Sequence, residues 1–524
     1  MLNKLKAPNI ILIVLDALRA DKVLSTYKNK NLTPTLKSLL QNSIYFNNCI
    51  TNSTWTVPSH INMFTGLYQT QKWLLSKSKT KFGNKIPILT EILKDLGYFN
   101  ICFTENPWIN EKMEFTRGFD IVLKNWKPSF IRMEKSKIFQ ITTFFLKIID
   151  LKLKKIKSKK FLNFWYSFKN KFEAIIIKML QKLYWKKIIF NYRNETINKL
   201  EDLNLILKNE YDNKPFYLFF NIMATHGPYI PIDEVKKYFG ITNHDFKIIK
   251  NFLLNPLSST VNINIRTKYL SDKKIEIVKK LYNACVFYSD QIVNKIITIL
   301  KNLRLLENSY VIITSDHGEQ LCDKLDHYLR GHGTPQSVYE ALVRVPLFIY
   351  NTNFKKKIIK NQIELKDLFH TILHLTGVPI AENKFLNIHK SIIHQINNNS
   401  TPKYIFGEFV KLKERMIALA NNNRKYLKKD LILKLISNIY FLRSDMYKYI
   451  KYSIGVEEFY NLSKDPFEKY NIINKKNEDF LKMKLYLEKY FNKISNTEEL
   501  IEIATEREKD LLKKSISSLK INDF

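Results

Sequence analysis

Short apolar runs alternate with longer segments of helical period along most of the chain. The expected strands are Ile10–Leu15, Ile44–Ile50, Asn100–Thr104, Phe216–Ile222, Tyr310–Thr314 and Val345–Tyr350. The expected helices are Thr33–Gln41, Leu89–Leu96, Lys274–Leu303 and Leu365–Leu375. Continuous apolar runs separated by helical periods are typical of βαβ units, in which helices cover both faces of a sheet. The pattern therefore predicts an α/β fold with a mixed or mainly parallel central sheet flanked by helices.

Polar residues follow four of the expected strands. Asp16 ends the first, Thr56 follows the second after a short loop, His226 follows the fourth, and Asp316 and His317 end the fifth. Ligands of such sheets bind at the carboxyl ends of the strands, where loops and helix N-termini converge. We therefore expect these residues to share one edge of the sheet.

These residue types suit the cleavage of a phosphate or sulfate ester. The reaction needs a cation near the ester oxygens, a nucleophile held in line and a proton donor for the leaving group. The Thr56 hydroxyl is a weak nucleophile at neutral pH and must be activated by a metal. Asp16, Asp316 and His317 can hold one divalent ion together with Thr56. One imidazole and hard oxygen ligands leave Mn²⁺, Mg²⁺, Ca²⁺ and Zn²⁺ open.

Thr56 also begins an expected helix that runs to about Thr65, with Pro58 in its first turn and Gly66 after its end. The free N–H groups of a helix N-terminus favour an anion. Nucleophile and anion cradle would therefore coincide. Taken alone, this segment indicates only an ordinary helix cap, and the other polar residues are what favour a catalytic role.

A basic segment interrupts the pattern at about 128–190, where sixteen Lys or Arg face three acidic residues and are interleaved with aromatic residues. We interpret 128–212 as a helical insertion. It either forms a lid whose apolar stripe packs on the main domain, which we favour, or lies on an anionic membrane surface.

The C-terminal region predicts a small antiparallel sheet and a charged helical tail. Its expected strands are Lys403–Glu408, Met416–Ala420, Lys425–Leu427 and Phe459–Tyr460. The tail from Asn474 onward contains a helix cap signal at 496–499. The expected organisation is a catalytic domain at 1–400, a small α+β subdomain at 401–472 and the tail at 473–524.

Composition adds little to the choice of partner. The net charge of +36 favours an anionic partner, but heavy Lys, Ile and Asn usage with only 12 Gly is typical of an AT-rich genome, and we favour this compositional explanation. The four cysteines are scattered, which predicts a reducing compartment. The first apolar run is too short to span a bilayer. We expect a cytoplasmic protein that binds no nucleic acid, with peripheral membrane contact left open.

Several motifs resemble the sulfatase family of the alkaline phosphatase superfamily in sequence and order. They are PNIILIVLDALRAD, WTVPSHINMFTGLY, ATHGPYIP, TSDHGE and GHGTPQSVYEALVRVPLFI. Two later stretches, LKDLFHTILHLTGVP and EFYNLSKDPFEKYNI, resemble segments of the same family. The resemblance implies an alkaline-phosphatase-like fold, a metal on Asp16, Asp316 and His317, and a nucleophile at Thr56.

The resemblance also implies roles for residues around the nucleophile. His226 corresponds to a histidine near the transferred group, and His332 to one near the leaving oxygen. His60 replaces the Arg of the family's motif, and we count it with the catalytic residues. Ser59, at the start of the same helix, is a candidate for substrate binding.

The chain departs from the family at informative positions. Sulfatases carry Cys or Ser where Thr56 stands and oxidise it to formylglycine, which the extra methyl group of Thr disfavours. Ala17 replaces a second Asp, which favours a single metal ion. No Gly-Lys-Trp-His stretch is present; CFTENPW stands instead, and Glu105 and Asn106 are candidates for lining the substrate site.

A Thr nucleophile with Asp, Asp and His resembles the phosphoglycerol transferases and phosphodiesterases of the superfamily. The leading hypothesis is phosphoester hydrolysis or phosphoryl transfer through Thr56. The alternatives are a sulfuric ester hydrolase that works without formylglycine, and a non-catalytic protein that binds anionic glycans or lipids.

Overall fold

The computed structural model describes most of the predicted catalytic domain and part of the C-terminal region. The described residues are 7–76, 81–83, 86–125, 196, 199–209, 214–254, 270–332, 337–379, 385–410, 437–475 and 477–495. The basic segment at 128–190 lies outside them, and with it the choice between a lid and a membrane surface. The predicted strands Met416–Ala420 and Lys425–Leu427 and the cap signal at 496–499 also lie outside.

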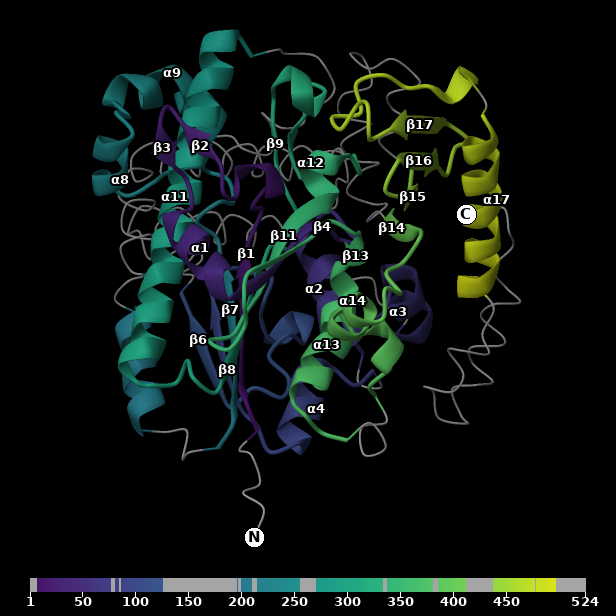
Figure 1. Ribbon diagram of the computed structural model, residues 1–524. Helices are drawn as coiled ribbons and strands as arrows, with labels where there is room; N and C mark the ends of the chain where they lie inside the picture. The colour runs from purple at the N-terminus through teal and green to yellow at the C-terminus, as the bar shows by residue number, and fades with distance from the viewer. Residues whose placement is uncertain are drawn as a thin grey trace, which may run out of the picture.

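A nine-stranded mixed sheet forms the centre of the molecule (Figure 1). Its strands are β1 (Asn9–Leu15), β4 (Ser43–Ile50), β5 (Phe99–Thr104), β6 (Ile121–Lys124), β7 (Phe216–Ile222), β8 (Ser309–Thr314), β11 (Arg344–Tyr350), β12 (Lys357–Ile359) and β13 (Ile363–Glu364). Their order is β12-β4-β11-β8-β1-β7-β5-β6, with β13 also on β4. Strand β1 is parallel to β7 and β8, whereas β11 is antiparallel to β8 and β4. The mixed sheet and all six predicted strands are confirmed.

Strand β1 shows why its sequence is a continuous apolar run. All seven of its residues are buried. Ile11 and Ile13 belong to the core on one face of the sheet, and Ile10 and Leu12 to the core on the other. A central strand covered on both faces has no solvent side, so its sequence does not alternate.

Helices cover both faces, as Figure 1 shows. On one side lie α1 (Pro34–Leu39), α8 (Asp233–Tyr238), α9 (Asn243–Leu254) and α11 (Asp272–Asn302). On the other lie α2 (Thr56–Thr65), α4 (Leu89–Asp95), α13 (Leu368–Leu375) and α14 (Ile392–Asn397). The four predicted helices are confirmed, although Leu365–Asp367 is a 3-10 turn that precedes α13. Among the described residues, no helix has the length and apolar character needed to cross a bilayer.

A four-stranded antiparallel sheet lies beside the main body and confirms the predicted C-terminal sheet. It consists of β14 (Ile405–Phe409), β15 (Ile439–Arg443), β16 (Tyr447–Tyr452) and β17 (Glu457–Asn461), in that order. Helix α17 (Glu478–Ser495) packs against one of its faces through Phe480, Met483 and Leu487. Strands β15 and β16 were not predicted from the sequence.

Buried ion pairs connect this small sheet to the segment that follows the predicted site. Arg443 on β15 donates to both carboxylate oxygens of Glu340 at 3.0 and 3.1 Å, and Glu340 lies on the short helix α12 (Glu340–Val343). Lys448 on β16 pairs with Glu340 at 3.2 Å and with Glu468 at 3.0 Å. These contacts place the small sheet next to β11. The remaining short elements are β2 (Thr26–Tyr27), β3 (Lys30–Asn31), α3 (Gln69–Ser76), β9 (Gln320–Leu321) and β10 (Arg330–Gly331).

Candidate active site

The predicted ligands meet because three strands end level with one another. In the register of the sheet, Leu15 of β1 lies opposite Ile222 of β7, and Val14 lies opposite Thr314 of β8. Asp16 and Asp316 therefore leave the sheet side by side. The backbone N–H of Ala17 donates to Asp316 Oδ1 at 3.2 Å, which joins the two turns.

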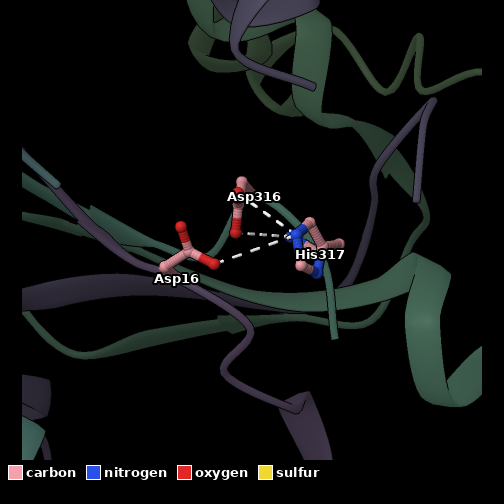
Figure 2. A group of neighbouring side chains, drawn as sticks. All are labelled: Asp16, Asp316 and His317. Carbon is pink, nitrogen blue, oxygen red and sulfur yellow. Dashed lines mark hydrogen bonds and ion pairs between the residues drawn. The ribbon is translucent and has the colours of Figure 1, made fainter. Parts of the chain in front are cut away.

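Asp16, Asp316 and His317 point toward one another at this edge (Figure 2). One ligand atom from each lies within 4.8 Å of the other two. His317 Nε2 is 3.8 Å from Asp16 Oδ1 and 3.4 Å from Asp316 Oδ2. All three side chains are fully buried, and these three atoms have no hydrogen-bond partner. Each such buried atom costs about 1–3 kcal/mol, so the arrangement is unfavourable unless a cation satisfies it.

The other polar atoms of the three ligands are held by the protein. Asp316 Oδ1 accepts the backbone N–H groups of Ala17 and His317, the latter at 2.9 Å. Asp16 Oδ2 accepts from Asn106 Nδ2 at 2.7 Å. His317 Nδ1 lies 2.9 Å from the carbonyl oxygen of Gly318, which can only accept, so Nδ1 carries the proton and Nε2 presents a lone pair. Each ligand therefore offers one oriented lone pair, as metal sites require.

Burial shifts the pKa of Asp316 and the pKa of His317 in opposite directions. It raises the pKa of Asp316 to about 7, against an ordinary value of 3.8. Burial, and then the neighbouring His332, lower the pKa of His317 to about 3. A neutral imidazole is the form that binds a metal, and a bound cation would favour the Asp316 carboxylate that burial disfavours. Two carboxylates and one imidazole fit a divalent ion such as Mn²⁺, Mg²⁺, Ca²⁺ or Zn²⁺.

Thr56 lies beside these ligands at the start of α2. Its side chain is 4% exposed, and Oγ1 is 3.4 Å from Asn106 Nδ2, the same nitrogen that holds Asp16. The N-cap position is taken by Trp55, and no side-chain bond caps the helix. The helix ends at Gly66, whose φ of +69° is the left-handed conformation that favours glycine. The hydroxyl of Thr56 is thus directed to the site and not to the helix end.

Ser59 and His60 join α2 to the turn that carries Asp316. Ser59 Oγ donates to the carbonyl oxygen of Asp316 at 2.7 Å. His60 Nδ1 donates to the carbonyl oxygen of Thr56 at 2.8 Å and lies 3.7 Å from Asp316 Oδ2. The His60 ring packs edge-on against Phe219, and burial lowers its pKa to about 4. In the structure, both side chains bond to the protein itself; their predicted substrate-binding and catalytic roles stay predictions.

His226 and His332 flank the predicted metal ligands. The His332 ring centroid is 4.2 Å from that of His317 and 4.7 Å from that of His226. His332 Nδ1 lies 3.1 Å from Glu319 Oε2. Burial raises the pKa of Glu319 to about 7, while burial and the neighbouring His226 lower the pKa of His332 to about 3. The sequence analysis assigned no role to Glu319, although it is the last residue of the TSDHGE motif.

Glu105 and Asn106 follow β5 but face different partners. Asn106 reaches Asp16 and Thr56. Glu105 accepts from the backbone N–H of Met223 at 2.8 Å and from Asn125 Nδ2 at 3.1 Å, and also from the hydroxyl of Thr196. Glu105 therefore braces the ends of β5 and β7, and its predicted contact with substrate stays a prediction.

Comparisons with known proteins identify the family of the chain. The model of the family described as "Sulfatase" matches residues 8–378. Among curated proteins, arylsulfatase K of Canis lupus familiaris is 25% identical over 511 residues, covering 90% of this chain and 79% of its own length.

Solved structures show the same fold. A 2-O glycosaminoglycan sulfatase superposes with a TM-score of 0.61 at 15% identity, covering 94% of this chain and 93% of its own. The phosphonate monoester hydrolase of Agrobacterium radiobacter superposes with a TM-score of 0.58 at 15% identity, covering 93% of this chain and 95% of its own. The family match extends over more than half of the chain and includes every residue of the candidate site. The chain therefore belongs to the sulfatase family of metal-dependent ester hydrolases.

Proposed function

We propose that this chain cleaves phosphate esters by nucleophilic attack of Thr56, as a phosphoester hydrolase or phosphoryl transferase. The observation that carries the proposal is the position of the Thr56 hydroxyl. It stands at the N-terminus of a ten-residue helix, 3.4 Å from the amide that also holds Asp16. Formylglycine is made from Cys or Ser, and this position holds Thr instead. The Thr56 hydroxyl can attack phosphorus directly.

In the proposed reaction, the Thr56 hydroxyl gives up its proton to water, Oγ1 forms a bond to phosphorus, and the bond from phosphorus to the leaving oxygen breaks. The leaving oxygen takes a proton from the pair formed by His332 and Glu319, whose Nδ1–Oε2 distance is 3.1 Å and whose carboxyl pKa burial raises to about 7, so that the pair holds a proton near neutral pH. His226 is proposed to contact the transferred group, and the position of its ring 4.7 Å from that of His332 supports this role. Water or an acceptor alcohol then attacks phosphorus, releases the product and restores the Thr56 hydroxyl.

Asp16, Asp316 and His317 would hold the divalent cation, with Thr56 as the fourth protein group near it. When bound, the cation supplies charge neutralisation at the ester oxygens and favours ionisation of the hydroxyl. The protein's own contribution is to bury these ligands, fix their lone pairs and keep the nucleophile beside them.

Paired substrates and a matched control test the proposal. Release of 4-nitrophenol would be measured from bis(4-nitrophenyl) phosphate and from 4-nitrophenyl sulfate, with metal supplied, for the wild type, Thr56→Ala and Thr65→Ala. Thr65 lies at the other end of α2 and bonds to the Ile61 carbonyl, so its variant controls for damage to the helix. We expect phosphate release by the wild type and the Thr65 variant, and a loss of about 10³-fold or more in Thr56→Ala.

Intact-protein mass spectrometry of quenched reactions should show a phosphoryl adduct on Thr56 that is missing in Thr56→Ala. Release from the sulfate without release from the phosphate would overturn the proposal. That result would favour the second candidate, a sulfate ester hydrolase that uses an unmodified threonine. The similarity to arylsulfatase K and to the 2-O glycosaminoglycan sulfatase is the observation in favour of this second candidate.

A further inference from the structure

We propose that Asn106 is a positioning residue for the nucleophile and for one metal ligand, and that it does not bind substrate. The inference rests on the proposed role of Thr56 and goes one step beyond it. It replaces the substrate-binding role that the sequence suggests for Asn106.

The surrounding backbone fixes the orientation of the Asn106 amide. Its Oδ1 accepts the backbone N–H of Trp108 at 2.9 Å, and its own backbone N–H donates to Thr104 Oγ1 at 3.1 Å. An oxygen must stand where the Trp108 N–H points, because the amide nitrogen only donates. Nδ2 therefore faces the site, and the usual ambiguity between the two amide atoms does not arise.

Nδ2 of Asn106 carries two hydrogens, and two oxygens of the protein lie within its reach. Nδ2 lies 2.7 Å from Asp16 Oδ2 and 3.4 Å from Thr56 Oγ1, so each hydrogen has an oxygen of the protein to which it can donate. Both hydrogens are thus directed at protein atoms, and Asn106 is only 1% exposed. The amide has no hydrogen left for an ester oxygen.

These two bonds orient the Asp16 carboxylate and the Thr56 hydroxyl. Asp16 has two equivalent oxygens, and the bond to Oδ2 leaves Oδ1 as the unpartnered atom that faces His317 Nε2. The bond to Thr56 occupies one lone pair of Oγ1 and directs the hydroxyl toward the same place. At 3.4 Å it is long for a neutral hydroxyl, and it strengthens as the oxygen gains negative charge during attack.

The backbone around Asn106 is held rigidly. Asn106 follows directly after β5, which pairs along its whole length with β7, and Glu105 fixes the backbone of Met223 at the end of β7. A donor held this firmly acts on geometry and reaction rate, because its orientation does not have to be gained on binding.

Two variants at Asn106 and one matched control test the inference. Asn106→Asp keeps the shape and the acceptor for Trp108 but replaces the donor, and Asn106→Ala removes the group. Asn110→Ala is the control: it lies in the same loop and accepts the Met113 N–H at 3.0 Å. The measurements are kcat and KM for bis(4-nitrophenyl) phosphate at saturating metal, the metal affinity by chelator competition, and the rate of adduct formation at Thr56.

Both Asn106 variants should lose about 10- to 100-fold in kcat and in the rate of adduct formation, with KM within about twofold of wild type. Their metal affinity should fall by about 10-fold or more. Asn110→Ala should match the wild type in all of these. A raised KM with unchanged kcat would assign Asn106 to substrate binding and overturn the inference, as would wild-type kcat in both variants. If the wild type itself forms no adduct at Thr56, the proposed function fails, and the inference fails with it.

Discussion

Asp316→Asn should stabilise the metal-free protein and at the same time remove its stabilisation by a divalent cation. The carboxylate is fully buried, and Oδ2 has no hydrogen-bond partner. An asparagine fits the same space: its Oδ1 can accept the two backbone N–H groups that Asp316 now accepts. Its Nδ2 then stands at the position of Oδ2, 3.4 Å from His317 Nε2, to which it can donate.

The magnitude follows from the pKa of Asp316, which burial raises from 3.8 to about 7. Each pKa unit corresponds to about 1.4 kcal/mol, so keeping this group ionised in the folded state costs about 4 kcal/mol above pH 7. A raised carboxyl pKa means that the folded state binds its proton more tightly than the unfolded state. The cost is therefore absent below pH 3.8, grows between pH 3.8 and about 7, and is complete at higher pH.

Urea unfolding of chelator-treated protein, at pH 8 and at pH 4, would measure this difference. We expect the variant to exceed the wild type by about 4 kcal/mol at pH 8 and by very little at pH 4. Metal at 100 times its dissociation constant should add about 2.7 kcal/mol to the wild type and much less to the variant. If metal stabilises Asp316→Asn as much as the wild type, Asp316 is not a ligand and the assignment of the site is wrong.

Two further predictions concern residues outside the ligand set. Glu408 accepts hydrogen bonds from the backbone N–H and the hydroxyl of Thr70, and burial raises its pKa to about 7. In urea unfolding, Glu408→Gln should therefore raise the free energy of unfolding by about 3 kcal/mol at pH 8 and by little at pH 4. Its stabilisation by metal should be unchanged. A smaller metal response in that variant would show that the Asp316 comparison lacks a clean control. Gly318→Ala should lose metal-induced stabilisation in thermal melts, because its Cβ would lie 1.9 Å from the Ala341 carbonyl oxygen. The control is Gly97→Ala, whose Cβ would meet open space; it should lose only about 1 kcal/mol of stability, because its φ is +84°. Equal melts for the two glycine variants would contradict this.

Burial on both faces made the central sheet readable from the sequence. Strands such as β1 and β7 are unbroken apolar runs, and both are fully buried. The edge strands were missed because they are short and partly exposed: β6 has four half-buried residues and β12 has three, two of them exposed.

In the C-terminal sheet, β16 reads YKYIKY, yet Lys448 is fully buried. Its partners Glu340 and Glu468 come from distant parts of the chain. No local pattern announces such a pair, so a buried lysine looks like a surface residue.

The proposed ligand set could be predicted because Asp16 directly follows β1, Asp316 and His317 come soon after β8, and the motifs resemble a known family. The roles of Asn106 and Glu319 could not. They depend on which atom of a side chain faces which neighbour: Asn106 Nδ2 toward Asp16, and Glu319 Oε2 toward His332. Side-chain orientation across strands that are distant in sequence is a property of packing, and sequence spacing does not contain it.

The unfavourable part of the site falls on the proposed metal ligands and not on the proposed nucleophile. Asp16, Asp316 and His317 each bury an atom without a partner, whereas Thr56 presents a neutral hydroxyl that already receives a bond from Asn106. Changes at the ligands should therefore alter stability and its response to metal together. Removing the Thr56 hydroxyl, in contrast, takes away a reacting atom while leaving those three unpartnered atoms in place. Loss of turnover with the metal response retained is consequently the result that separates a nucleophile from a ligand at this site.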